Sequence, residues 1–234
     1  MLEIRNLCVN YGEKTVFKDF SLSVGDKEIL CVMGKSGCGK TTLLNAIAGL
    51  VPHSGEISGA DGVSYMFQED RLIPSLTAMS NVTFATAHLY KDKKEAEKTA
   101  IESLKAVGLE GFENRYPHTL SGGQAARVSL ARAFAYPSGL LITDEPFKGL
   151  DIATTDLMEK YFLELFSNSR KCAVIVSHSV EEAVNLADRV VVLGGSPCDV
   201  VFETALDMPR PEREKNAAYT AEKAAEIKAA IIAS

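Results

Sequence analysis

The sequence predicts an α/β fold with a mainly parallel sheet, an N-terminal antiparallel β subdomain and an inserted helical lobe. The parallel sheet is predicted from five short apolar runs separated by stretches of helical periodicity, near residues 29–33, 63–67, 139–144, 172–177 and 189–193. The antiparallel part is predicted from alternating apolar residues close to the N-terminus, such as Leu2, Ile4, Leu7 and Val9.

A glycine-rich loop follows the first of the five apolar runs and fits the pattern G-x-x-x-x-G-K-[ST], with the residues Gly34, Lys35, Ser36, Gly37, Cys38, Gly39, Lys40 and Thr41. Apolar residues recur at helical spacing after it, up to Leu50. A strand, a glycine loop and a helix in this order point backbone N–H groups and the positive helix end at a phosphate chain. We therefore expect a phosphate-loop NTPase core, in which Lys40 reaches the β- and γ-phosphates and Thr41 binds Mg²⁺. The alternative is a glycine-rich turn before a core helix.

Composition limits the classes of protein that remain. The formal net charge of −6 gives no broad attraction to nucleic acid, so no nucleic-acid partner is expected. No apolar run is long enough to span a bilayer, and the first residues lack the pattern of a signal peptide. Five scattered cysteines without C-x-x-C spacing favour reduced thiols over a zinc site. Among them Cys38, inside the phosphate loop at a helix N-terminus, is expected to have a lowered pKa.

Two carboxylates end the third apolar run. In phosphate-loop NTPases an aspartate at the end of such a strand supports Mg²⁺, and Asp144 takes that position. Glu145 follows directly and projects differently, so we expect it to act as the general base that polarises the attacking water.

The pentapeptide Leu120-Ser121-Gly122-Gly123-Gln124 precedes another apolar-periodic helix, which contains Val128, Leu130, Ala131 and Phe134. It offers a second helix N-terminus and a serine hydroxyl to an anion. One chain cannot readily bring both helix N-termini to the same γ-phosphate, so a second copy of the chain is expected to close the site.

Together these motifs resemble, over nearly the whole chain, the nucleotide-binding subunit of ABC (ATP-binding cassette) transporters. The pentapeptide is similar to the signature of that family, and Gly149-Leu150-Asp151 is similar to its D-loop. The resemblance implies that Tyr11 stacks on adenine, that Gln68 is the Q-loop glutamine and a Mg²⁺ ligand, and that His178 senses the γ-phosphate. A lone tyrosine, glutamine or histidine at a strand end is otherwise a structural residue, and Asp151 could equally cap the helix after it.

The resemblance implies a complete set of candidate residues. Gln68, Glu145 and His178 are the catalytic candidates, and Thr41, Gln68 and Asp144 are the metal ligands. The nucleotide-binding set consists of Tyr11, the loop from Gly34 to Thr41, Thr42, Ser121, Gly122, Gly123, Gln124 and Asp151. The cofactors implied are ATP and Mg²⁺.

The resemblance also divides one ABC ATPase domain into parts. Residues 1–69 and 137–205 form the catalytic core with its antiparallel part, residues 70–136 the helical signature lobe, and residues 206–234 a helical tail. The resemblance further implies that two cassettes, a homodimer, sandwich ATP at the cytoplasmic face of the membrane. It also implies that the lobe contacts an integral membrane permease through a segment near Leu72, Ile73 and Leu76, unless that segment packs internally on the lobe.

Two further passages, Phe67–Pro74 and Leu206–Pro211, are similar to the nitrate/sulfonate/taurine importer group. The implied function is an ATP-hydrolysing importer subunit that also depends on an extracytoplasmic solute-binding protein. Alternatives are an exporter or lipid-extracting ABC system, a soluble ABC ATPase without a transport role, and a phosphate-loop kinase or GTPase.

Overall fold

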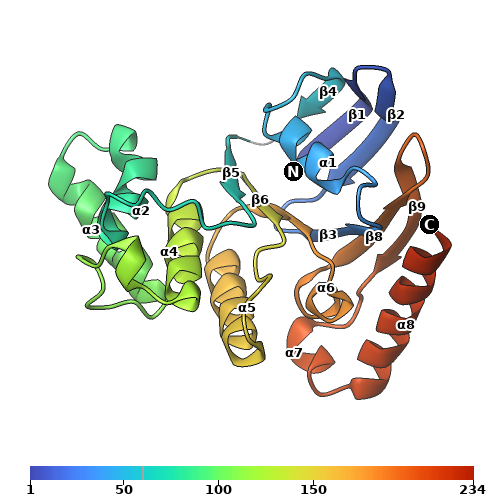
Figure 1. Ribbon diagram of the computed structural model, residues 1–234. Coiled ribbons are helices and arrows are strands. Elements are labelled where there is room, and N and C mark those ends of the chain that lie inside the picture. Colours follow the sequence, from blue (N-terminus) through green and yellow to red (C-terminus); the bar gives the residue numbers. More distant parts are fainter. Residues whose placement is uncertain (60) are drawn as a thin grey trace.

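The larger of two sheets forms the centre of the molecule. A computed structural model of the chain describes residues 1–59 and 61–234 (Figure 1). The strand order of the larger sheet is β5-β6-β7-β3-β8-β9, and all neighbours are parallel except β8 and β9. Its strands are β3 (Ile29–Gly34), β5 (Val63–Met66), β6 (Leu140–Asp144), β7 (Cys172–Val176), β8 (Arg189–Gly194) and β9 (Asp199–Ala205). The predicted mainly parallel sheet is confirmed, and the antiparallel edge strand β9 is an addition that the apolar runs did not indicate.

The smaller sheet contains β1 (Leu2–Tyr11), β2 (Lys14–Val24) and β4 (Ser54–Ser58), in the antiparallel order β2-β1-β4. Leu2, Ile4, Leu7 and Val9 of β1 are buried, as their alternation predicts, in one cluster with residues of the larger sheet and the first helix. This sheet lies above the central sheet in Figure 1 and carries the end of β1 toward the phosphate loop.

The helical lobe lies at the opposite end of the molecule from the C-terminal helix (Figure 1). It contains α2 (Ala78–Thr86), α3 (Lys93–Ala106) and α4 (Gly122–Ala135), with short 3₁₀ turns at Ala87–Leu89 and Pro117–Thr119. The inserted lobe of the predicted fold is therefore present. The spacing of Ile101, Leu104, Val107 and Leu109 predicts an amphipathic helix with Ile101 on its apolar face, and this detail is wrong. α3 packs through Ala96, Ala100 and Leu104, and Ile101 is 42% exposed. The small alanines allow close packing one helical turn apart, and this register turns Ile101 outward.

The helix after the phosphate loop is shorter than its apolar spacing predicts. α1 spans Lys40–Ile47, and it is terminated by Gly49, two residues further on, which has a φ of 68°. The Gly49 N–H donates to Ala46 O (3.0 Å) and the Leu50 N–H to Asn45 O (2.8 Å), the two bonds of a Schellman cap. Leu50 consequently lies outside the helix and is exposed.

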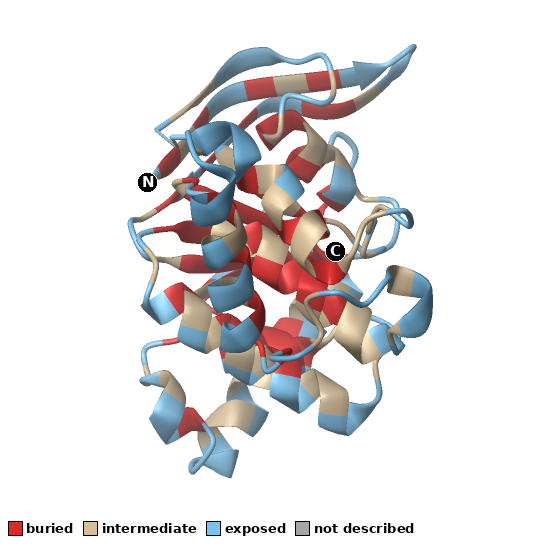
Figure 2. Cartoon of the chain, turned by 90° about the vertical axis from the view of Figure 1, so that its left-hand side faces the viewer, coloured by how far each residue is buried: buried red, intermediate tan, exposed pale blue. Residues whose placement is uncertain are grey.

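Four helices follow β6 in the chain: α5 (Ile152–Ser167), α6 (Val180–Leu186), α7 (Arg210–Arg213) and α8 (Ala217–Ala233). Buried residues fill the middle of the molecule between the sheets and the helices (Figure 2). Phe162 of α5 contacts Phe134 of α4 edge-on, with ring centroids 5.6 Å apart, and so joins the lobe to the core. Within the described residues 1–59 and 61–234, every helix is too short or too polar to cross a membrane.

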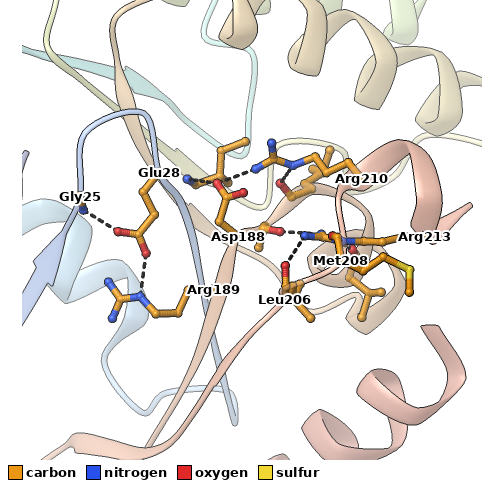
Figure 3. A network of polar contacts seen from close by, with 12 residues as sticks. Gly25, Glu28, Asp188, Arg189, Leu206, Met208, Arg210 and Arg213 are labelled. Carbon is orange, nitrogen blue, oxygen red and sulfur yellow. Dashed lines mark hydrogen bonds and ion pairs between the residues drawn. The ribbon is translucent and has the colours of Figure 1, made fainter. Parts of the chain in front are cut away.

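A buried arginine ties the C-terminal segment to the core (Figure 3). The Arg213 guanidinium is 3% exposed and donates to the carbonyls of Val184 (2.9 Å), Ala187 (2.6 Å), Leu206 (2.7 Å) and Met208 (2.6 Å). Two of these carbonyls lie at the C-terminal end of α6, where a positive charge also favours the helix dipole. This one side chain therefore satisfies carbonyls from α6 and from the segment that follows β9.

We expect Arg213→Met to destabilise the fold by about 4 kcal/mol, because three buried carbonyls and one half-buried carbonyl lose their donor while the apolar volume is roughly kept. For a chain of this size that corresponds to a fall in Tm of roughly 8–16 °C. Thermal unfolding followed by circular dichroism measures the change. Arg170→Met, at an exposed arginine, is the matched control and should leave Tm within about 2 °C. Equal Tm values for the two variants would contradict this role of Arg213.

Candidate nucleotide-binding site

The phosphate loop connects the end of β3 to the start of α1, as the sequence predicts. Two of its glycines are required by close contacts. A Cβ on Gly34 (φ 140°) would lie 2.4 Å from the Leu193 carbonyl oxygen, and a Cβ on Gly39 (φ 122°) would lie 2.9 Å from Val16 Cγ1. The loop is thus pressed against β8 on one side and β2 on the other, in a backbone conformation that favours glycine.

A cavity of about 260 Å³ opens over this loop. Its walls come from the smaller sheet, the phosphate loop and the ends of β6 and β7, with the lining residues Tyr11, Lys14, Val16, Ser36, Gly37, Gly39, Lys40, Thr41, Thr42, Glu145 and His178. The structure therefore brings seven of the fifteen nucleotide-binding candidates together with the catalytic candidates Glu145 and His178. Tyr11, at the end of β1, is 49% exposed, so its ring is available at the rim of the cavity.

The two lysines of the loop point in different directions. The Lys40 ammonium is buried and donates to Gly34 O (2.8 Å) and Lys35 O (3.0 Å), inside the curl of the loop. The Lys35 ammonium instead donates to the carbonyls of Ile232 (3.2 Å) and Ser234 at the end of α8. Of the two side chains, the one of Lys40 is placed for a phosphate.

Cys38 also behaves differently from an ordinary thiol. A hydrogen bond from Cys198, supported by the charge of Lys40, lowers the pKa of Cys38 to about 6, while burial opposes the shift. The same pairing and burial raise the pKa of Cys198 well above its ordinary value. The lowered pKa agrees with the expectation, but its largest cause is the neighbouring thiol rather than the helix N-terminus.

The candidate metal ligands lie beside this cavity. The Thr41 hydroxyl donates to Asp144 Oδ2 at 2.9 Å, and both residues line a second cavity, of about 460 Å³, together with Gln68. Burial raises the pKa of the Asp144 carboxyl, whereas the bond from Thr41 opposes that shift. A hydroxyl, a carboxylate and an amide oxygen fit Mg²⁺, which takes few protein oxygens and completes its shell with water and phosphate.

Glu145 and His178 are in direct contact. His178 Nε2 lies 2.7 Å from Glu145 Oε1, and Lys148 Nζ lies 2.6 Å from Glu145 Oε2. Glu145 has a φ of 49°, an unfavourable conformation for a residue with a side chain, and its N–H donates to Val176 O (2.8 Å) at the end of β7. Strain of this kind costs of order 1–3 kcal/mol and is typical of functional sites. The carboxylate is thereby held between β6 and β7, at the wall of the nucleotide cavity.

The signature residues lie elsewhere. Ser121 caps α4: its hydroxyl accepts from the Gln124 N–H (3.3 Å), and Gln124 Oε1 accepts from the Ser121 N–H (2.9 Å). Asp151 caps α5 by accepting from the Thr154 N–H (3.0 Å) and hydroxyl (2.7 Å), which lowers the pKa of Asp151. Gly123 packs on Thr154, since a Cβ there would lie 2.8 Å from Thr154 Cγ2.

Ser121, Gly122, Gly123, Gln124 and Asp151 are thus held next to one another, at the N-terminal ends of α4 and α5. Within residues 1–59 and 61–234 they are not among the residues that line the cavity over the phosphate loop. Ser121 and Gly122, at the N-terminus of α4, are exposed.

Several lining residues were not predicted from the sequence. Lys14 and Val16 of β2 contribute to the first cavity, and Lys148 contacts Glu145. Tyr65 and Phe67 stack with ring centroids 3.9 Å apart, and the Arg71 guanidinium lies 3.8 Å over Phe67, at the second cavity. The i, i+2 spacing of the two aromatic residues at the end of β5 was an available signal that they share a face.

A phosphate-binding loop after a parallel strand, a strand-end aspartate on the loop threonine and an adjacent glutamate define a phosphate-loop nucleoside triphosphatase. Comparison with known proteins makes the class more specific. Residues 17–148 match the ABC transporter family, more than half of the chain. The protein belongs to the ABC transporter family and is an ATP-binding ATPase of that family, which excludes the kinase and GTPase alternatives.

Relatives and a solved structure agree with this assignment. The taurine import ATP-binding protein TauB of Escherichia coli strain K12 is 41% identical over 221 residues, covering 90% of this chain and 86% of its own length. TauB of Shigella sonnei strain Ss046 gives the same values. The dimeric ATP-binding cassette MJ0796, in a post-hydrolysis state with ADP and Pi, aligns with a TM-score of 0.78 at 30% identity, over 89% of this chain and 100% of that one.

Proposed function

We propose that this chain is the ATPase subunit of an ABC importer for taurine or a related small solute such as another sulfonate or nitrate. The observation that carries the proposal is the division of the site: among the described residues, the signature residues are not part of the lining of the cavity over the phosphate loop. Identity to taurine import proteins supports the direction of transport and the class of solute. The dimeric state of the similar cassette supports pairing of two chains.

In the proposed dimer each ATP lies between the phosphate loop of one chain and the signature residues of its partner. Tyr11 stacks on the base, Lys40 binds the β- and γ-phosphates, and Ser121 with the N-terminus of α4 meets the γ-phosphate from the other side. Asp151 approaches the same interface, because Gly123 packs on Thr154 beside it. ATP therefore favours the closed dimer, and loss of the γ-phosphate releases it.

Within the site, Glu145 accepts a proton from the attacking water, and His178 holds Glu145 in place and contacts the γ-phosphate. Thr41, Asp144 and Gln68 would hold Mg²⁺, which would neutralise charge on the phosphates. Gln68 lines the second cavity with Thr41 and Asp144, so it links the proposed metal position to the lobe that begins after β5.

The proposed location is the cytoplasmic face of the membrane, on an integral membrane permease that receives solute from an extracytoplasmic binding protein. The segment between Gln68 and α2 is the proposed permease contact. Asn81 holds this segment rigidly: its amide accepts from the Ile73 N–H (2.7 Å) and donates to the carbonyls of Leu76 (3.1 Å) and Thr77 (3.0 Å). Leu72 packs partly on the core, so the proposed contact surface consists of Ile73 and Leu76, both half-buried.

Purification from native membranes tests the importer function. Pulled down under mild solubilisation, the chain should bring a multi-spanning permease with it. Reconstitution of that complex in vesicles should give ATP hydrolysis that rises when a taurine-loaded solute-binding protein is added. A complex that contains no membrane protein, or whose ATPase responds only to a substrate on the cytoplasmic side, would overturn the importer function and leave the ATPase assignment intact.

A further inference from the structure

The loop that carries His178 is held by hydrogen bonds that the proposed mechanism does not yet use. The Ser179 N–H donates to Ser177 Oγ at 2.9 Å, and the Ser177 hydroxyl donates to Glu182 Oε2 at 2.9 Å. Glu182 in turn donates its own N–H to Ser179 Oγ at 3.1 Å. These three bonds link Ser177, Ser179 and Glu182 to one another, and His178 lies between the two serines in the chain.

This arrangement differs from an ordinary capping box, and the chain itself supplies the comparison. At the start of α4, Gln124 accepts the N–H of the capping residue Ser121 directly, at 2.9 Å. At the start of α6, the capping serine gives its N–H to Ser177 and Glu182 bonds the Ser177 hydroxyl instead. This arrangement includes Ser177, the residue directly before His178, in the cap of α6. Glu182 therefore restrains the His178 loop in addition to capping the start of the helix.

Glu182 is an acidic residue in a buried position. It is 7% exposed, and its Oε1 atom has no hydrogen-bond partner among the described residues. It lines a cavity of about 280 Å³ whose other walls include Glu145, Lys148 and His178. A buried, ionised carboxylate with a free oxygen is costly, so this geometry favours the protonated acid.

The charges around Glu182 act in the same direction. Burial raises the pKa of the Glu182 carboxyl to about 8, the charges of Glu159 and Glu145 add to the shift, and the bond from Ser177 opposes it. The titratable groups that face Glu182 come from four elements: Cys31 on β3, Glu145 and Lys148 after β6, Glu159 on α5 and His178 after β7. Glu159 is half-buried, and this desolvation raises its pKa to about 7, although it accepts a hydrogen bond from Asn185.

We propose that Glu182 is a positioning residue, which through the Ser177 hydroxyl holds the His178 loop so that the imidazole meets Glu145. This inference rests on the proposed roles of Glu145 and His178. When Glu182 ionises, its free oxygen requires a donor, and the nitrogen donors that line the shared cavity are Lys148 and His178. Both already contact Glu145. An ionised Glu182 therefore competes with Glu145 for these donors, and its charge repels the Glu145 carboxylate.

The test is the pH dependence of steady-state ATP hydrolysis by the full chain and three variants. For the wild-type chain we expect kcat to fall as the pH rises through about 8. In Glu182→Ala, kcat at pH 7 should fall about tenfold while KM for ATP changes less than about twofold. Glu182→Gln, which keeps an acceptor for Ser177 and cannot ionise, should restore most of that rate and abolish the alkaline fall. Glu181→Gln, at the exposed neighbouring position on α6, is the matched control and should keep the wild-type profile.

Three results would overturn the inference: wild-type kcat in Glu182→Ala, a Glu182→Gln variant as slow as Glu182→Ala, or an alkaline fall that persists in Glu182→Gln. ATP binding, measured by calorimetry, separates a variant with an altered loop from a variant that is unfolded. If Glu182→Ala does not fold, the pH profiles of kcat for the wild-type chain and Glu182→Gln still decide the outcome. A wild-type chain that hydrolyses no ATP at any pH would instead contradict the proposed function itself.

Discussion

Glu145→Gln is expected to bind ATP with nearly wild-type affinity and to hydrolyse it about 10²- to 10⁴-fold more slowly. The amide has the shape of the carboxylate but cannot accept the proton of the attacking water. The contact with His178 Nε2, 2.7 Å in the wild-type chain, can persist as a neutral hydrogen bond. The chain can therefore reach the ATP-bound state and remain there.

The same variant reports on the dimer. If ATP closes two chains on each other and hydrolysis opens them, Glu145→Gln with ATP should elute as a dimer in gel filtration, whereas the wild-type chain returns to monomer as ATP is consumed. Glu164→Gln, an isosteric loss of charge at an exposed position of α5, is the matched control and should hydrolyse ATP at the wild-type rate. A Glu145→Gln chain that stays active, or stays monomeric with ATP bound, would contradict the proposed site.

The sequence was sufficient to predict those features that depend on local pattern. Apolar runs of β-branched residues located the parallel strands, and the glycine loop after β3 located the nucleotide cavity. The interpretation of Asp151 as a helix cap is also confirmed by its bond from the Thr154 N–H. This cap was predictable because an aspartate before an apolar-periodic stretch is a local signal.

The features that were not predicted depend on contacts between distant segments. The helical spacing of Ile101 with Leu104 favours a buried Ile101, but α3 buries the small residues Ala96 and Ala100 instead. The pattern of the loop selects Lys40 for the phosphates, but the contact of Lys35 with carbonyls at the end of α8 depends on a distant segment of the chain. The burial of Glu182 near Glu145 and Glu159 likewise requires the packing of α6 on the sheet. The assignment of nucleotide and metal contacts to single residues stays a prediction.

Lys40→Ala is expected to weaken ATP binding at least about hundredfold. The ammonium is buried in the curl of the loop, where Gly34 O and Lys35 O orient it at 2.8 and 3.0 Å. Two hydrogen bonds from a charged donor to phosphate oxygens contribute roughly 1.5–3 kcal/mol each, and their loss corresponds to about 10²- to 10⁴-fold in Kd. Isothermal titration calorimetry with ATP measures the change directly.

Loss of the lysine also leaves two loop carbonyls without their donor, so the loop itself could be disturbed. Lys40→Met separates the two effects, because the methionine refills the buried space without a charge and should bind ATP as weakly as Lys40→Ala. Lys35→Ala is the comparison within the same loop. Its ammonium is bound to carbonyls at the end of α8, so its loss should weaken ATP binding less than about fivefold. If Lys35→Ala were the weaker binder, the phosphate contact would belong to Lys35, and the orientation of the two side chains in the ATP-bound state would differ from the one described.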